Sequence, residues 1–120
     1  MTKPVILVVD TNRSNLEMLS QELGQEGFET IVAASLDEMD QAIRGKQKYA
    51  LAIIDISGLD KGIWERCDPL HEVKVPFIIL APQRSQITQR ESMKHGAGGV
   101  LVKPINTKEL IEHIHTMLGD

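Results

Sequence analysis

Hydrophobic residues in this sequence gather into short continuous runs, separated by stretches with helical spacing. Four runs are almost wholly apolar, as in strands that are covered on both faces: residues 5–9, 50–55, 76–81 and 100–102. A fifth run, Phe28 to Ala33, includes Glu29 and Thr30. Its polarity predicts a strand at the edge of a sheet.

Between the runs, apolar residues recur every three or four positions. Leu16, Leu19 and Leu23 predict a helix from Ser14 to Gly24. This pattern indicates that strands and helices alternate along the chain.

Capping residues mark the starts of two more helices. Ser35 precedes Glu38 by three residues, which is the capping-box arrangement, and Gly45 predicts the end of that helix. Asn106 predicts the N-terminal cap of the closing helix. One face of the closing helix is apolar, comprising Leu110, Ile111, Ile114 and Leu118.

Two predicted helices are weakly defined. The segment 63–70 contains Pro69, which lacks an amide donor, so we expect a short or irregular helix. The segment 83–95 has only Ile87 and Met93 as apolar anchors, so we expect a helix that is weakly held.

The alternation of strands and helices predicts an α/β fold, in which a parallel sheet has right-handed crossovers and helices on both faces. In such a sheet, ligands bind outside the carboxyl ends of the strands. The residues at those ends are Asp10, Asp55, Ala81 and Lys103. We therefore expect a functional site at this edge of the sheet.

Composition and charge narrow the class of protein. The 120 residues are 42% hydrophobic and 25% charged, which fits a single domain over residues 1–120. The net charge of -4 is interspersed and argues against direct nucleic-acid binding. The single cysteine excludes an internal disulfide. The first apolar run is too short for a signal peptide or membrane span, so we expect a cytoplasmic protein without membrane contact.

Asp10, Asp55 and Lys103 would place two carboxylates beside one ammonium group. Two like charges about 4 Å apart repel by roughly 4 kcal/mol at an effective dielectric constant near 20. Lys103 supplies one compensating charge, and Mg²⁺ bound by oxygen ligands would supply more. A carboxylate beside magnesium and lysine can attack a phosphoryl group.

Three segments carry a family resemblance: residues 6–10 with Asn15, residues 53–55, and residues 96–104. With them the chain resembles, over essentially its whole length, the receiver domain of two-component response regulators. The resemblance implies a flavodoxin-like, three-layer (βα)5 fold with strand order 2-1-3-4-5. It also implies that a histidine kinase or phosphotransfer protein phosphorylates Asp55.

The same resemblance implies roles for the residues around Asp55. Asp10, Asp55 and the backbone carbonyl of Ser57 would hold Mg²⁺, and Lys103 would contact the phosphoryl oxygens. The Lys103-Pro104 bond is expected to be cis.

This sequence departs from the family pattern at three positions. Thr11 stands where receivers usually carry a second acidic residue, so we expect weak magnesium binding. Thr11 could be a weak ligand, a ligand through a water molecule, or a helix cap. Ala81 replaces a hydroxyl residue, and Val100 replaces the aromatic switch residue. Both parts of the usual hydroxyl-aromatic relay are therefore missing.

Three functional readings stay open. The first is a non-enzymatic receiver, monomeric or weakly dimeric, that signals through a partner protein, since we expect no output domain in 120 residues. The second is a pseudo-receiver, an interaction module that works without phosphorylation. The third, an aspartate-nucleophile phosphatase or dehalogenase, is disfavoured because such enzymes usually carry Asp-x-Asp where this chain has Asp10-Thr11-Asn12.

Overall fold

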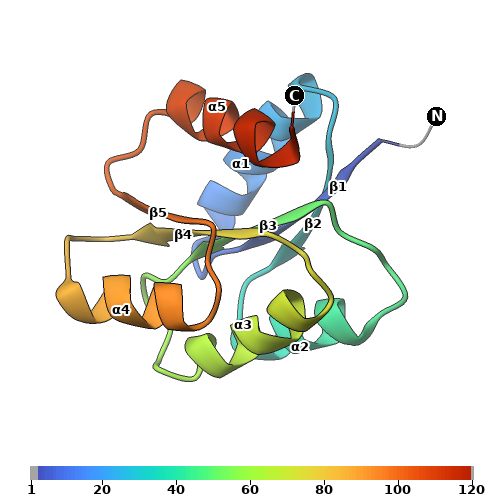
Figure 1. The fold of residues 1–120 in the computed structure, drawn as a ribbon. Coiled ribbons are helices and arrows are strands. Elements are labelled where there is room, and N and C mark those ends of the chain that lie inside the picture. Colours follow the sequence, from blue (N-terminus) through green and yellow to red (C-terminus); the bar gives the residue numbers. More distant parts are fainter. Residues whose placement is uncertain (1–2, 120) are drawn as a thin grey trace.

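The computed structural model describes residues 3–119 and shows five parallel strands in the order β2-β1-β3-β4-β5 (Figure 1). The strands are β1 Val5–Val9, β2 Glu29–Ala33, β3 Leu51–Asp55, β4 Phe77–Ala81 and β5 Gly99–Val102. The helices are α1 Arg13–Gln25, α2 Leu36–Arg44, α3 Ile63–Glu72, α4 Gln86–Lys94 and α5 Thr107–Leu118. The predicted flavodoxin-like fold and its strand order are confirmed. Residues 1, 2 and 120 of the predicted domain lie outside the described residues.

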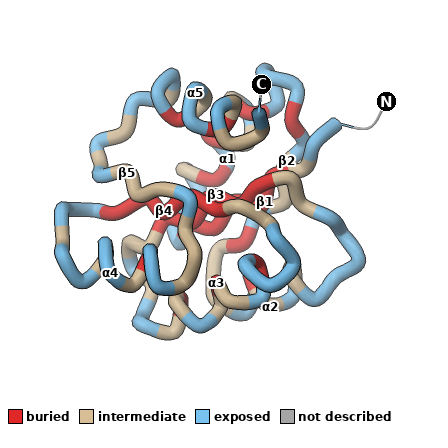
Figure 2. The backbone as a smooth tube through the Cα atoms, in the orientation of Figure 1, coloured by how far each residue is buried: buried red, intermediate tan, exposed pale blue. Residues whose placement is uncertain are grey.

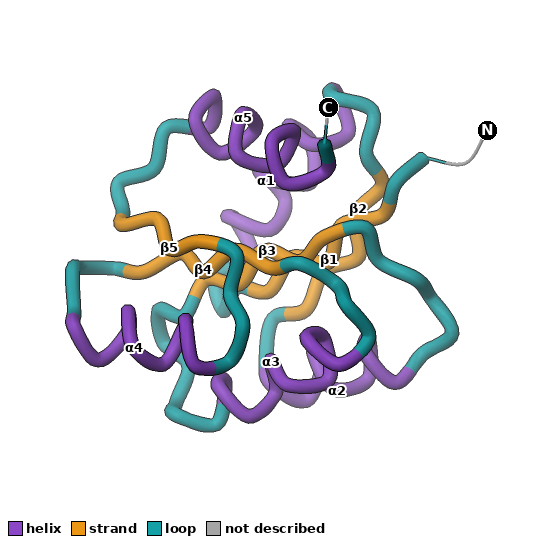
Figure 3. The backbone as a smooth tube through the Cα atoms, in the orientation of Figure 1, coloured by secondary structure: helices purple, strands orange, loops and turns teal. Residues whose placement is uncertain are grey.

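The helices form a layer on each face of the sheet (Figures 1 and 3). Helices α1 and α5 cover one face, and α2, α3 and α4 lie on the other. Successive side chains of β1 alternate between the layers: Ile6 and Val8 pack toward α1 and α5, whereas Leu7 and Val9 pack toward α2 and α3. Among residues 3–119, no helix is long and apolar enough to cross a bilayer.

The central strands are buried, and the polar strand lies at an edge. All five residues of β3 and all five of β4 are buried, so these strands are covered on both faces (Figure 2). Strand β2 pairs only with β1, and its Glu29 and Val32 are exposed. The prediction of an edge strand from residue polarity is confirmed.

Side-chain caps begin the helices where the sequence predicts them. The amide of Glu38 donates to Ser35 Oγ (3.1 Å), while the carboxylate of Glu38 accepts from the amide of Ala34 (3.1 Å). In the usual capping box the carboxylate accepts from the amide of the capping residue, here Ser35, whereas the Glu38 carboxylate accepts from the amide of the residue before it. The amide of Lys108 donates to the side chain of Asn106 (2.8 Å).

Helix α3 differs from its prediction as a short or irregular helix. It runs through Pro69 and ends at Glu72 rather than at Leu70. Cys67 and Leu70, on either side of the proline, are both buried against the sheet. Their burial offsets the cost of a helical proline, about 3 kcal/mol, and so tertiary packing overrides the local signal.

Helix α4 is not anchored by the predicted residues. Ile87 and Met93 are 72% and 69% exposed, whereas Ser92 is the buried residue of this helix. The Ser92 hydroxyl has no hydrogen-bond partner. A buried serine does not register in a hydrophobic pattern, which is why the prediction chose the wrong face.

The end of α3 suggests a stabilising substitution at Lys74, which has a left-handed backbone (φ 62°). The amide of Val75 donates to the carbonyl of Leu70 (2.8 Å) and holds this turn. Because glycine adopts this conformation without strain, Lys74→Gly is expected to raise the free energy of unfolding by about 1 kcal/mol, measured by denaturant unfolding. Val73→Gly is the control, since Val73 has φ -90° and offers no strain to relieve. An unfolding midpoint for Lys74→Gly at or below that of the parent protein would contradict the prediction.

Candidate functional site

Asp10, Asp55 and Lys103 meet at the carboxyl edge of the sheet. Asp10 follows β1, Asp55 ends β3, and these strands are neighbours. Both aspartates are only 2% exposed. Lys103 follows β5, and its Nζ contacts Asp55 Oδ2 across the end of β4. The structure thus brings together the three charged residues that the sequence predicts for the site.

Both carboxylate oxygens of Asp55 have partners. Oδ1 accepts a hydrogen bond from the amide of Ser57 (2.9 Å), and Oδ2 contacts Lys103. The ammonium group of Lys103 also donates to Ser57 Oγ (3.2 Å). Ser57 therefore positions Asp55 through its amide and Lys103 through its hydroxyl.

Thr11 is held by the loop after β3. Its hydroxyl donates to the backbone carbonyl of Ser57 (3.1 Å), which is the carbonyl expected to bind magnesium. Gly58 has φ 78°, and a Cβ on it would lie 3.0 Å from Thr11 Oγ1. The helix-capping alternative for Thr11 is wrong, because the side chain of Asn12 caps α1 by accepting from the amide of Asn15 (3.1 Å).

Ionisation of the Asp10 carboxyl group is unfavourable at this buried position. Burial raises the pKa of Asp10 above its ordinary value, and the nearby Asp55 carboxylate raises it further. The pKa is lowered in part by hydrogen bonds from Asn12 and Asn15 and by the charge of Lys103. The site therefore retains a carboxylate whose ionised form the surrounding protein disfavours.

Asp10→Asn is expected to stabilise the fold near neutral pH. A raised pKa means that the folded protein binds this proton more tightly than the unfolded chain, so the contribution of Asp10 to stability falls as pH rises above 3.8, its ordinary value. Removing the charge should raise the unfolding temperature at pH 7, and the gain should shrink on acidification. Glu17→Gln, on the exposed face of α1, is the control. A less stable Asp10→Asn at pH 7 would contradict this prediction.

The donor set of the site suits a hard cation. Asp10, Asp55 and the Ser57 carbonyl offer only oxygen ligands, and Mg²⁺ accepts one or two carboxylates while keeping several waters. Within residues 3–119 there is no group of three or more His, Cys, Asp or Glu side chains placed to hold a metal. Because the protein offers so few ligands, the site fits a magnesium ion that keeps several water molecules. The Ser57 carbonyl can bind the ion once the Thr11 hydroxyl turns away.

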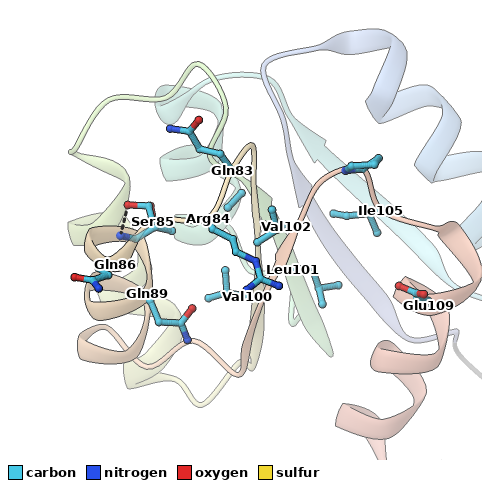
Figure 4. Close-up of a pocket in the computed structure, with 13 residues that line it drawn as sticks. Gln83, Arg84, Ser85, Gln86, Gln89, Val100, Leu101, Val102, Ile105 and Glu109 are labelled. Atoms are coloured by element: carbon cyan, nitrogen blue, oxygen red, sulfur yellow. Dashed lines mark hydrogen bonds between the residues drawn. The ribbon is translucent and has the colours of Figure 1, made fainter.

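A cleft of about 530 Å³ lies beside the site, between the start of α4 and strand β5 (Figure 4). Its lining includes Ala81 and Val100, where the family resemblance implies a hydroxyl and an aromatic ring. Figure 4 shows Arg84 extending from the loop before α4 toward β5. Small side chains thus line the cleft where the usual relay would stand.

Sequence reasoning missed the contacts made by the Thr11 and Ser57 side chains. Each of the two hydrogen bonds, from Thr11 to Ser57 and from Lys103 to Ser57, joins residues 46 positions apart. The position of Ser57 two residues after Asp55 is the one signal that could have drawn attention to its hydroxyl.

A family model described as the response regulator receiver domain matches residues 6–115. The chain is 30% identical over 118 residues to the transcriptional regulatory protein CpxR of Escherichia coli K12, a match covering 94% of this chain and 48% of that protein. It is 29% identical over 119 residues to a probable chemotaxis protein CheY of Rhizobium etli, covering 95% and 92%. The chain thus spans about half the length of CpxR.

Solved structures have the same fold. A CheY-like receiver domain protein from Methanospirillum hungatei superposes with a TM-score of 0.89 at 28% identity, covering 98% of this chain and 95% of that one. A response regulator from Burkholderia pseudomallei, described with a phosphorylated aspartic acid, a calcium ion and citrate, superposes with a TM-score of 0.83 at 24% identity, covering 97% and 69%. At that identity, the second likeness shows the fold alone.

Proposed function

This chain belongs to the response regulator receiver domain family of two-component systems, and from that premise we propose that Asp55 accepts a phosphoryl group from a histidine kinase or phosphotransfer protein. One observation carries the proposal: a buried Asp55 lies beside the carboxylate of Asp10 and contacts the ammonium group of Lys103. This arrangement supplies a nucleophile together with the positive charge that the transfer needs.

In the proposed transfer, a carboxylate oxygen of Asp55 attacks the phosphorus of a phosphohistidine. An oxygen–phosphorus bond forms, the phosphorus–nitrogen bond breaks, and the imidazole leaves with the electron pair. Lys103 then exchanges its contact with Asp55 for contacts with phosphoryl oxygens. The Ser57 amide, now bonded to Asp55 Oδ1, holds the carboxylate in place (2.9 Å).

We propose that Asp10, Asp55 and the Ser57 carbonyl hold the magnesium ion, which would neutralise negative charge on the phosphoryl group. The Burkholderia protein is described with both a phosphorylated aspartic acid and a calcium ion. Thr11 weakens the proposed magnesium site of this chain, because threonine adds no charge and its hydroxyl bonds the Ser57 carbonyl. Magnesium binding should therefore be weak.

The outcome of phosphorylation would be a changed contact with a protein partner. The relatives are described as a transcriptional regulatory protein and a probable chemotaxis protein. We propose that this domain passes its signal on by protein–protein contact, as a monomer or weak dimer. The net charge of -4 supports a protein partner over direct nucleic-acid contact.

Acetyl phosphate tests the proposal without requiring the cognate kinase. The protein is incubated with acetyl phosphate and millimolar Mg²⁺, and its intact mass is expected to rise by one phosphoryl group. Beryllofluoride with Mg²⁺ is expected to shift backbone amide signals around Asp55. If neither the phosphoryl adduct nor the amide shifts appear at millimolar Mg²⁺, the phosphorylation proposal is overturned and the pseudo-receiver is favoured. The Thr11–Ser57 bond and the absence of a hydroxyl at Ala81 would be consistent with a pseudo-receiver.

A further inference from the structure

Every polar group of Ser57 is hydrogen-bonded to a residue of the Asp55 site. The Ser57 amide donates to Asp55 Oδ1 (2.9 Å), and the Ser57 carbonyl accepts from the Thr11 hydroxyl (3.1 Å). The Ser57 hydroxyl accepts from the ammonium group of Lys103 (3.2 Å). The family resemblance implies a role for the backbone carbonyl of Ser57 alone, so the contact of its hydroxyl is an additional feature of this chain.

The Ser57 hydroxyl lies on the side of Asp55 where a phosphoryl group would be attached. Oδ1 of Asp55 is held by the Ser57 amide, whereas Oδ2 contacts Lys103. A phosphoryl group on Oδ2 would enter between that oxygen and the ammonium group. Because the nitrogen of Lys103 contacts both Asp55 Oδ2 and Ser57 Oγ, a group that enters there lies next to the serine hydroxyl.

The chemistry of the hydroxyl allows it to bind a phosphoryl oxygen. A serine hydroxyl has one donor and two acceptor positions, and Lys103 uses one of the acceptor positions. The O–H group can therefore donate to an anionic oxygen, and hydrogen bonds of that kind are short and strong. Ser57 is half-buried, so its hydroxyl can turn without disturbing the core.

The position where the family resemblance implies such a hydroxyl is apolar in this chain. Ala81 ends β4 there, and Val100 stands where an aromatic ring is implied. Neither side chain can form a hydrogen bond with a phosphoryl group. The Ser57 hydroxyl would supply the missing contact from the loop after β3 instead of from the end of β4.

The loop after β3 is coupled to the beginning of α3. Within the loop, the amide of Leu59 donates to the carbonyl of Ile56 (3.1 Å). The amide of Trp64, in the first turn of α3, donates to the carbonyl of Lys61 (3.3 Å). Leu59 and Trp64 also pack against the same core cluster. A displacement of the loop would therefore be passed to the first turn of α3.

We propose that the Ser57 hydroxyl donates a hydrogen bond to a phosphoryl oxygen on Asp55 and thereby transmits phosphorylation to the loop at residues 56–62. The inference rests on the proposed phosphorylation of Asp55. Mg²⁺ would take the Ser57 carbonyl from Thr11, and the phosphoryl group would draw the hydroxyl, so both changes act on the same residue. The surface that changes for a protein partner is then this loop with the first turn of α3, rather than the cleft beside α4 (Figure 4).

Beryllofluoride, which binds an aspartate carboxylate as a mimic of the phosphoryl group, tests the hydrogen bond. At a Mg²⁺ concentration that saturates each variant, Ser57→Ala is expected to bind beryllofluoride about tenfold more weakly than the parent protein, because a hydrogen bond to an anionic group is lost. Ser57→Thr restores a hydroxyl and should recover most of the lost affinity. Ser20→Ala is the control, since Ser20 lies on α1 beside the edge strand β2. Equal affinity in Ser57→Ala and the parent protein would overturn the inference.

Backbone amide signals separate this role from simple support of Lys103. In the parent protein at saturating beryllofluoride, we expect larger shifts for the amides of residues 58–64 than for those of α4. In Ser57→Ala, the shifts of residues 58–64 should largely disappear even at saturation. A hydroxyl that only held Lys103 in place would leave these shifts intact at saturation, and that result would overturn the inference.

Acetyl phosphate labelling of the same proteins distinguishes this inference from the proposed function. If the parent protein forms neither a phosphoryl adduct nor a beryllofluoride complex, the proposed function is overturned and this inference with it. If the parent protein forms the adduct and its loop shifts match those of Ser57→Ala, the role of the Ser57 hydroxyl alone is overturned.

Discussion

Asp55→Asn is expected to abolish phosphorylation by acetyl phosphate completely. An amide has no anionic oxygen to attack phosphorus, and the other carboxylate of the site, Asp10, cannot substitute because it lacks the contact that Asp55 makes with Lys103. Intact-mass analysis in the presence of Mg²⁺ should show only the unmodified protein. This is the largest effect expected of any substitution in the chain.

Asp60→Asn is the matched control for that experiment. Asp60 lies in the loop after Asp55, is exposed, and accepts a hydrogen bond from the amide of Gly62 (2.7 Å). Its asparagine variant should label as the parent protein does. Circular dichroism should show that Asp55→Asn stays folded. A phosphoryl adduct on folded Asp55→Asn would mean that another residue is the acceptor.

Thr11→Asp is expected to tighten magnesium binding by at least about tenfold, or about 1.4 kcal/mol. The substitution adds a carboxylate close to Asp10 and Asp55, where a divalent cation would be attracted to three negative charges instead of two. It also removes the hydroxyl that now bonds the Ser57 carbonyl, which becomes free to face the metal. Magnesium titration followed by amide chemical shifts measures the affinity.

Thr11→Val separates these two contributions. Valine has nearly the shape of threonine but cannot donate to Ser57, so it frees the carbonyl without adding charge. We expect a much smaller gain in affinity than for aspartate. Equal affinity in the parent protein and in Thr11→Asp would show that position 11 lies outside the metal site. Because a third carboxylate adds repulsion when no metal is bound, Thr11→Asp should also be less stable in metal-free buffer.

Most of the fold could be predicted because its signals are local. Continuous apolar runs identify β1, β3 and β4 as covered strands, and the polar residues of β2 identify an edge. The character of a whole segment is enough to show each of these features. The cis bond between Lys103 and Pro104, which the family resemblance implies, is also present.

The errors arose where tertiary packing outweighs the local pattern. Pro69 predicts a short or irregular helix over residues 63–70, but the buried residues beside it keep α3 helical to Glu72. The pattern in α4 favours Ile87 and Met93 as anchors, yet the helix turns Ser92 inward. A hydrophobic pattern describes which face is apolar, and it fails for a helix that turns a polar residue inward.

The sequence by itself determined which charged residues reach the edge of the sheet. Asp10, Asp55 and Lys103 each follow an apolar run, and parallel strands bring their carboxyl ends to one edge. Only the tertiary structure decided how these residues are partnered. The Thr11–Ser57 bond and the Lys103–Ser57 bond each span 46 positions. Such pairings depend on angstrom-scale packing between separate elements, for which neither residue spacing nor composition provides a signal.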